Sequence, residues 1–146
     1  MKNTLLWRTD KDLNIQQVLA LYNAVNWTAY TEKPLELMRG ISNSSYVVSS
    51  WKEERLVGLI RIMSDDFSIV YIQDVLVAPD FQRQGIGREL VKRSMVRYRH
   101  VRQKVLLTDN RPDQIAFYES LGFHSVRKLS NTIINSFVRI EGSKLD

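Results

Sequence analysis

The stretch that decides the fold runs from Ile69 to Val91 and reads IVYIQDVLVAPDFQRQGIGRELV. Its first half, Ile69 to Ala78, is rich in Ile and Val and has no glycine, which is the composition of a buried β-strand. Pro79 ends this strand, because proline has no N–H for the sheet and biases the preceding residue away from helix. From about Gly85 the apolar residues fall on one face, which predicts a helix.

The turn between this strand and helix predicts a phosphate site. It reads Gln82-Arg83-Gln84-Gly85-Ile86-Gly87, and its two glycines let the backbone come close to an anion. The N–H groups of the first helical turn and the helix dipole favour negative charge at the same place. Arg83 and Arg88 add two positive charges. A glycine pair also occurs in ordinary turns, so the turn alone does not decide between the two interpretations.

The order of these features resembles a known family. Strand, proline, Q-x-x-G-x-G and basic helix resemble motif A of the GNAT superfamily of N-acetyltransferases, with Gln82, Gly85 and Gly87 in its fixed positions. Residues 116–123, AFYESLGF, are similar to that family's FYEKLGF sequence. The two motifs stand in the family's order, about 30 residues apart, which argues against chance. The resemblance is sharp over residues 69–123.

The resemblance implies an α/β fold with a mixed sheet, helices on both faces and the order βααβββαβαββ. It implies acetyl-CoA as co-substrate and direct transfer of the acetyl group to a primary amine. The fourth strand of this fold diverges from the fifth, and the backbone of Leu76 and Val77 would bind the pantetheine arm there. Near the fifth strand, Asn110 is the expected coenzyme contact, with Arg111 as the alternative. The full expected coenzyme-binding set is Leu76, Val77, Gln82, Arg83, Gln84, Gly85, Ile86, Gly87, Arg88 and Asn110.

Periodicity and turn residues predict the other elements. Helices are expected over Asp12–Val25, Pro34–Ile41, Gly85–His100 and about Pro112–Leu121. Strands are expected over Thr4–Arg8, Tyr46–Lys52, Leu56–Met63, Ile69–Ala78, Lys104–Thr108, Phe123–Leu129 and Thr132–Ile140. No linker or repeat separates them, so residues 1–146 are expected to form a single N-acetyltransferase domain.

Composition narrows the class of protein. Hydrophobic residues make up 44% of the 146, with no apolar run of transmembrane length and no signal sequence, so a cytoplasmic protein without membrane contact is expected. The chain has no cysteine and two separated histidines, so no metal site is expected. We expect both histidines, His100 and His124, to be structural or exposed.

The positive charge is concentrated in one segment. The chain carries +5, whereas residues 82–104 hold eight basic residues and one acid. Coenzyme phosphates explain the charges nearest the turn, and a solvated helix face explains the rest. Nucleic acid is a further interpretation of such a segment, but we do not expect it as a partner.

Two side chains are candidates for proton transfer. Tyr118 occupies the tyrosine position of the family's FY pair, so the resemblance implies that it protonates the departing thiolate; the alternative is a core aromatic. Asp74 is the carboxylate inside an otherwise apolar strand. It is either the base that accepts the proton of the amine or a structural residue bonded to backbone or to an arginine.

The acceptor site is the least determined feature. Trp27 and Tyr30 lie before the second expected helix, in a region that resembles that of arylalkylamine (serotonin-like) members. Aromatic rings suit an aromatic amine by stacking and its ammonium by cation–π attraction, whereas Trp27 as a core residue is equally compatible. Polyamines, aminoglycosides and a protein N-terminus or lysine stay open as acceptors. A coenzyme A-binding module that senses or binds nucleic acid is the alternative function, and a homodimer is an open assembly state.

Overall fold

The computed structural model describes residues 4–143 and 145. They fall into two compact units, residues 1–107 and 108–146, which are considered separately below. The single domain expected over residues 1–146 stays a prediction.

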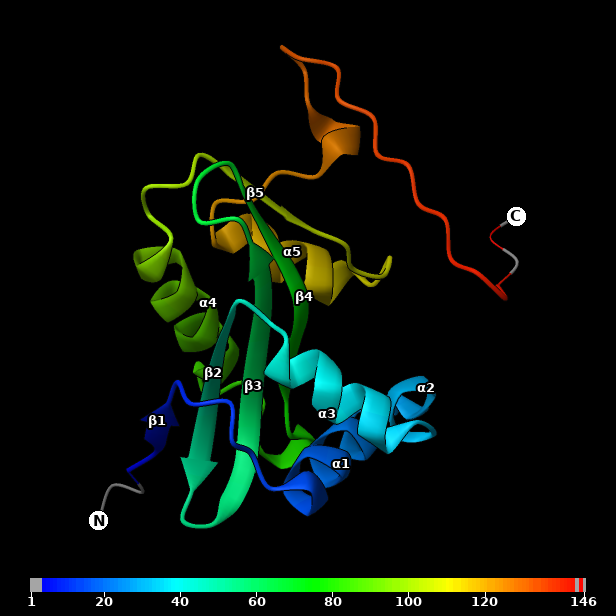
Figure 1. Cartoon of the computed structure of the whole chain (residues 1–146). Helices are drawn as coiled ribbons and strands as arrows, with labels where there is room; N and C mark the ends of the chain where they lie inside the picture. The colour runs from blue at the N-terminus through cyan, green and yellow to red at the C-terminus, as the bar shows by residue number, and fades with distance from the viewer. Residues whose placement is uncertain (1–3, 144, 146) are drawn as a thin grey trace. The chain divides into compact units, whose positions relative to one another are not determined.

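The first unit is built on a mixed five-stranded sheet in the order β1-β2-β3-β4-β5 (Figure 1). The first four strands pair antiparallel, and β5 pairs parallel with β4, so the predicted mixed sheet is confirmed. The strands are β1 (Leu6–Arg8), β2 (Tyr46–Lys52), β3 (Arg55–Ser64), β4 (Ile69–Val77) and β5 (Gln103–Leu106).

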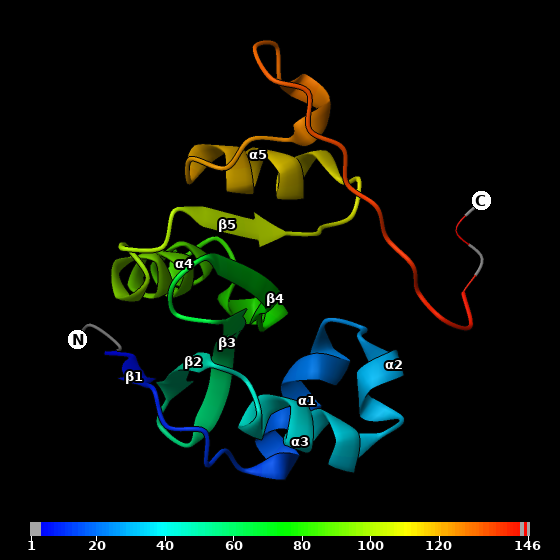
Figure 2. The same ribbon diagram turned by 45° about the horizontal axis from the view of Figure 1, so that its top comes forward.

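Helices cover both faces of this sheet. The helices of the first unit are α1 (Ile15–Ala24), α2 (Thr28–Thr31), α3 (Pro34–Ser42) and α4 (Ile86–Arg97). Helix α4 packs on β2, β3 and β4, and α1 packs on β3 and β4 from the other side (Figures 1 and 2). Strand β3 is therefore covered by helices on both faces, and its residues 56–62 are all buried. The short helix α2 was not among the predicted elements; it forms where the sequence places Trp27 and Tyr30.

Gly58 sets the distance between β3 and α4. A Cβ at this position would lie 2.9 Å from Ile86 Cγ2 and 3.3 Å from Leu90 Cδ1. Ile86 is the first residue of α4, so the absence of a side chain at Gly58 lets the start of the helix rest directly on the sheet. The sheet thereby fixes the turn that precedes α4.

The second unit contains α5 (Pro112–Ser120), which begins with a proline at its first turn. Here the sequence prediction was wrong in one respect, because neither of the last two expected strands forms. Within Phe123–Leu129 the chain forms a short 3₁₀ turn, η2 (Val126–Lys128), and the Lys128 ammonium lies 3.0 Å from the Glu119 carboxylate of α5.

Residues 132–140 have strand composition but pair with no other strand in the described part of the chain. A strand needs a partner for its backbone N–H and C=O groups, and composition alone does not supply one. Their side chains are exposed, with Ile133 at 90% and Phe137 at 93%. No helix in the described ranges is long and apolar enough to cross a membrane.

Candidate active site

The turn between β4 and α4 has the geometry of an anion site. After the 3₁₀ turn η1 (Pro79–Phe81), Arg83 and Gly85 both have left-handed backbone, with φ of 64° and 83°. Helix α4 starts at Ile86, and its own hydrogen-bond ladder begins when Glu89 N–H donates to the Gly85 carbonyl, so the preceding N–H groups lie outside the ladder. A Cβ placed on Gly85 would meet no atom within 4 Å. The turn is therefore open to a ligand, and its shape fits a pyrophosphate.

Side chains around this turn hold it in place. Gln82 Nε2 donates to the Val77 carbonyl at 3.0 Å, which ties the turn to the end of β4. Arg55 forms a two-bond ion pair with Asp80, at 2.7 and 2.8 Å, and its guanidinium lies 5.2 Å from the Phe81 ring. Gln82 is thus placed to support the turn, while Arg83, Gln84 and Arg88 are exposed.

Strand β4 has an open edge beside this turn. Its parallel pairing with β5 runs from Ile69 to Ile72, where Ile72 lies opposite Leu106. Beyond that point residues 74–77 pair only with β3, and in the part of the chain that the structure describes no strand lies on their other side. The divergence that the resemblance implied is therefore present at Leu76 and Val77, although the Val77 carbonyl already accepts a bond from Gln82.

On the other face of the sheet, Asp74 is the centre of a buried hydrogen-bond network. Its side chain is 3% exposed. Its Oδ2 accepts from Arg61 Nε at 2.5 Å and from the Tyr22 hydroxyl at 2.8 Å, and its Oδ1 accepts from the Tyr30 hydroxyl at 2.8 Å. Gln73 Nε2 donates to the Tyr30 hydroxyl at 3.0 Å. The network therefore extends from the buried Arg61, through Asp74 and the Tyr30 hydroxyl, to the exposed Gln73.

The environment of this network shifts the pKa of three of its members. Burial, together with the negative charge of Asp74, raises the pKa of Tyr22 well above its usual value and also raises that of Tyr30. Burial alone would lower the pKa of Arg61, but the attraction of Asp74 outweighs it and the net pKa is raised. Both tyrosines therefore stay protonated as donors, and Arg61 stays charged, throughout the neutral range.

Three aromatic rings line the α1–α2 side of the network. Tyr22 and Tyr30 meet edge to face with centroids 5.2 Å apart, and Trp27 lies 6.0 Å from Tyr22 and 6.2 Å from Tyr30. Trp27 is 36% exposed and Tyr30 is half-buried, so both rings present surface to solvent. The structure thus brings the predicted acceptor residues together with the predicted base, Asp74.

Tyr118 and Asn110 belong to the second unit. Tyr118 lies on α5 between Phe117 and Phe123, with ring centroids 5.0 and 6.0 Å away. Burial, with a smaller contribution from Asp109, raises the pKa of Tyr118 to about 12. Asn110 is exposed in the loop before α5. The two histidines are exposed as expected, and His100 Nε2 lies 2.8 Å from the Asp66 carbonyl.

The arginine expected as an alternative partner of Asp74 is present and is Arg61, which the sequence analysis did not identify. Sequence reasoning also missed Tyr22 and Gln73 as members of the Asp74 network. A signal for Arg61 was present, because it is a charged residue inside the apolar strand β3, as Asp74 is in β4. Two opposite charges in neighbouring buried strands predict a pair. The sequence contains no comparable signal for Tyr22. It lies on the apolar face of α1, where a core residue with no role in the network would also lie.

Comparison with known proteins agrees with this geometry. The profile of the Acetyltransferase (GNAT) family matches residues 14–123. An uncharacterized N-acetyltransferase, ycf52, of Porphyra purpurea is 30% identical over 128 residues, covering 84% of this chain and 71% of the relative. Histone acetyltransferase TAP1 of Glycine max is 27% identical over 135 residues, covering 83% of this chain and 56% of that protein.

The solved structures lead to the same class. A GNAT family acetyltransferase, SP0256 of Streptococcus pneumoniae TIGR4, superposes with a TM-score of 0.75 at 29% identity, covering 94% of this chain and all of that one. The fold, the glycine turn and the open strand edge define an acyltransferase of mixed α/β architecture. The chain belongs to the GNAT family and is an acetyltransferase, and the family implies acetyl-CoA as its co-substrate.

Proposed function

We propose that this chain transfers the acetyl group of acetyl-CoA directly to a primary amine of a small molecule. The observation that carries the coenzyme half of the proposal is the open edge of β4 at residues 74–77, immediately before the glycine turn. The pantetheine arm would pair with this edge as an added strand, and the pyrophosphate would bind the first N–H groups of α4. Arg83 and Arg88 would add charge to the phosphates.

Tyr118 is the proposed acid. When the thioester breaks, the sulfur leaves as a thiolate, and a phenol hydroxyl can return a proton to it through a hydrogen bond. Burial raises the pKa of Tyr118 to about 12, so the hydroxyl holds its proton at neutral pH. Because this makes it a weaker acid than the thiol, its proposed contribution is a hydrogen bond that stabilises the developing thiolate.

For the acceptor, we propose the surface formed by Trp27 and Tyr30. The two rings offer stacking to an aromatic amine and cation–π attraction to its ammonium. Gln73, bonded to the Tyr30 hydroxyl, adds an exposed amide at the same place. An arylalkylamine is therefore the proposed acceptor class.

Asp74 is proposed to act through Tyr30. An alkylammonium must lose a proton before it attacks the thioester. Because Asp74 is buried, the Tyr30 hydroxyl would take the proton of the amine as it gives its own to Asp74 Oδ1. Tyr30 ends neutral and Asp74 ends protonated, so the transfer is balanced. Arg61 and Tyr22 hold the carboxylate in place for this step.

An amine panel with two variants at one position tests this arrangement. Tyr30→Phe keeps the ring and removes the hydroxyl, so it should lower turnover for aromatic and aliphatic amines alike. Tyr30→Ala also removes the stacking surface, which should lower kcat/KM for tryptamine by a further several-fold, about 1 kcal/mol, but not for spermine. If the unmodified protein prefers spermine to tryptamine, the aromatic acceptor is wrong, while the acetyltransferase assignment stands.

A protein lysine is the second candidate acceptor. The observation that favours it is the similarity to the Glycine max relative, which is named a histone acetyltransferase. A histone-tail peptide in the same panel decides the point, because a peptide acetylated faster than every free amine would replace the small-molecule proposal.

A further inference from the structure

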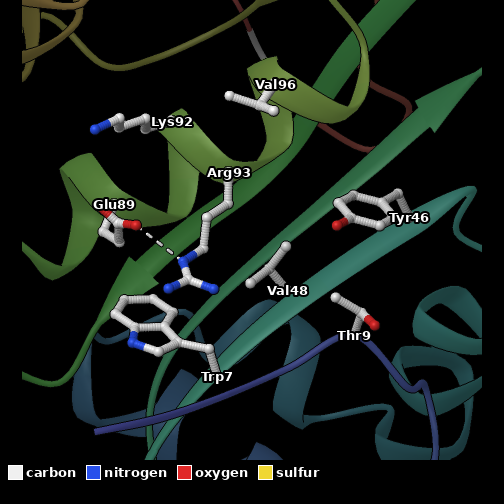
Figure 3. Close-up of a pocket in the computed structure, with 8 residues that line it drawn as sticks. All are labelled: Trp7, Thr9, Tyr46, Val48, Glu89, Lys92, Arg93 and Val96. Carbon is white, nitrogen blue, oxygen red and sulfur yellow. Dashed lines mark hydrogen bonds and ion pairs between the residues drawn. The ribbon is translucent and has the colours of Figure 1, made fainter.

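A cavity lies on the face of the sheet opposite the Asp74 network. It measures about 310 Å³, is partly open to solvent, and lies between strands β1 and β2 and residues 89–96 of α4 (Figure 3). Its walls are Trp7, Tyr46, Val48, Glu89, Arg93 and Val96, joined by Thr9 and Lys92 at the rim. None of the proposed coenzyme or acceptor residues lines it. The acetyl-transfer chemistry therefore leaves this cavity without a role.

Arg93 lines this cavity with a side chain that is 45% exposed and is oriented by two contacts. Its Cζ lies 4.5 Å from the centroid of the Trp7 ring, and its Nε donates to Glu89 Oε1 at 2.9 Å, one helical turn away. Figure 3 shows the side chain extending from α4 to lie over Trp7, close to Val48. Stacking and the Nε bond fix the plane of the guanidinium before any ligand arrives.

The outer edge of this guanidinium is available for an anion. Glu89 accepts a hydrogen bond from Nε and forms an ion pair with the guanidinium, and among the described residues none accepts a hydrogen bond from the two Nη groups. Those groups present parallel N–H donors, the arrangement that binds a planar carboxylate through two bonds. A lysine in the same place would offer a point charge without this fork.

The rest of the cavity is suited to an apolar body with few polar atoms. Val48 and Val96 form apolar walls, and Tyr46 contributes a ring edge and a hydroxyl. A volume of about 310 Å³ is at the small end of ligand cavities, which favours a small ligand. The lining also includes Lys92, a second cation, and Glu89, which is paired with Arg93. Apolar walls beside an oriented guanidinium match a small acid whose carboxylate is its principal polar group.

We propose that the cavity between β1, β2 and α4 is a binding site for a small apolar monocarboxylate, with its carboxylate on the Nη groups of Arg93 and its apolar body against Val48 and Val96. The site is independent of the proposed acetyl transfer. Nucleic acid, which the basic charge of α4 could also attract, is excluded by this proposal and is tested alongside it.

Titration of the ¹⁵N-labelled full chain with 3-phenylpropionate, followed by NMR, tests the site. The chain has three tryptophans, and the indole N–H signal of Trp7 should move with saturation while those of Trp27 and Trp51 stay in place. The neutral amide of the same acid is the matched probe, and it should bind at least tenfold more weakly, because it offers Arg93 no charge.

Three variants complete the design. Arg93→Gln should weaken binding at least tenfold, and Arg93→Lys should restore little of it, because the fork is lost. Arg99→Gln removes the same charge from an exposed site outside the cavity and should bind the acid as the unmodified protein does. Val96→Phe, which fills the cavity without touching its charge, should also abolish binding, and equal unfolding midpoints confirm that each variant folds.

Four results would overturn the proposal. The first is that the Trp7 signal shows no saturable movement at acid concentrations up to about tenfold above a Kd of about 1 mM, which corresponds to roughly −4 kcal/mol of binding energy. The second is equal binding of the acid to Arg93→Gln and Arg99→Gln, and the third is equal binding of the acid and its amide. The fourth is tighter binding of inorganic phosphate or single-stranded DNA at the same residues. The first would show no site, the second and third a non-specific surface or a purely apolar cavity, and the last a phosphate site.

Discussion

Asp74 and Arg61 are the charged side chains that the described structure buries inside the sheet, in neighbouring strands and 2.5 Å apart. Removing one partner of such a pair costs about 3–5 kcal/mol, because the other charge is left buried without compensation. Substitutions at Asp74 or Arg61 would therefore confuse stability with activity. The tyrosines that donate to Asp74 are better probes, since Phe keeps their shape.

Tyr22→Phe should change the response of stability to alkaline pH. In the folded protein burial raises the pKa of Tyr22 well above 10, so above pH 10 the unfolded chain loses this proton and the folded one keeps it. The contribution of Tyr22 to the free energy of unfolding is therefore fully present below pH 10. It falls by up to about 1.4 kcal/mol per pH unit as the pH rises from 10 toward the pKa of Tyr22 in the folded protein. Urea unfolding from pH 8 to 11.5 measures this slope.

In the Tyr22→Phe protein that contribution to the slope should be absent. At pH 8 the variant should also be about 1–3 kcal/mol less stable, because Asp74 loses one of its donors. Parallel curves for the two proteins above pH 10 would show that Tyr22 does not hold its proton as the structure requires.

Tyr118→Phe should lower turnover by about 10- to 1000-fold, the range of a single general acid, while leaving the affinity for acetyl-CoA nearly unchanged. Since the pKa of Tyr118 is about 12, the hydroxyl is protonated throughout pH 6 to 10, and the ratio of the two turnover rates should be constant over that range. Steady-state kinetics with a calorimetric control for coenzyme binding measures both. Turnover at the unmodified level from pH 6 to 9 would remove Tyr118 from the mechanism.

At the scale of elements, the region from β4 to α4 is where sequence and structure agree best. An apolar strand, a proline and a pair of glycines each act locally, so strand β4, the left-handed turn and helix α4 follow from adjacent residues. Strands β2 and β3 were equally predictable from composition and a tight turn at Glu53.

Features that depend on residues far apart in sequence could not be predicted in the same way. The bonds of Asp74 to Tyr22 and Tyr30 join residues 52 and 44 positions away, and nothing local specifies them. The prediction of the last two strands was wrong for a related reason. Residues 132–140 have the composition of a strand, but composition does not supply the neighbouring strand that would pair with it.

The packing of α4 on β3 gives a prediction for Gly58. Gly58→Ala should destabilise the protein by about 1–3 kcal/mol, because the new methyl group would press on the branched side chain of Ile86. Gly40→Ala is the matched control: its Cβ would lie 3.4 Å from Arg61 Nη1, an ordinary contact, within helix α3. Urea unfolding should show a loss for the first and none for the second; equal stability of both variants would contradict the close approach of helix and sheet.

Gly87 gives the corresponding prediction for coenzyme binding. It lies in the first turn of α4, where the proposed pyrophosphate would approach the backbone. Gly87→Val should fold but bind acetyl-CoA at least tenfold more weakly, since a branched side chain blocks that approach. Isothermal calorimetry measures the change, and unchanged affinity in a folded Gly87→Val protein would falsify the proposed site.

For the molecule as a whole, the positive charge of residues 82–104 is partly compensated within the structure. Arg93 pairs with Glu89 at 2.9 Å, and Arg97 lies 3.7 Å from Asp66. Arg97 also lies 5.0 Å from the ring of Tyr98. These contacts favour a solvated helix face over a nucleic-acid surface for the middle of α4. Arg83 and Arg88, beside the turn, are the charges that we propose for the coenzyme phosphates.

The most direct test of the central claim is acetyl transfer itself. The full chain is incubated with acetyl-CoA and a panel of tryptamine, phenethylamine, spermine, an aminoglycoside and a histone-tail peptide, and both free coenzyme A and acetylated product are measured, by thiol release and mass spectrometry. An acetyltransferase is expected to release free thiol and acetylated amine in equal amounts, with an arylalkylamine as the preferred acceptor. A protein that binds acetyl-CoA but releases no thiol above the uncatalysed rate with any acceptor would contradict this account and favour a coenzyme A-binding module without catalysis.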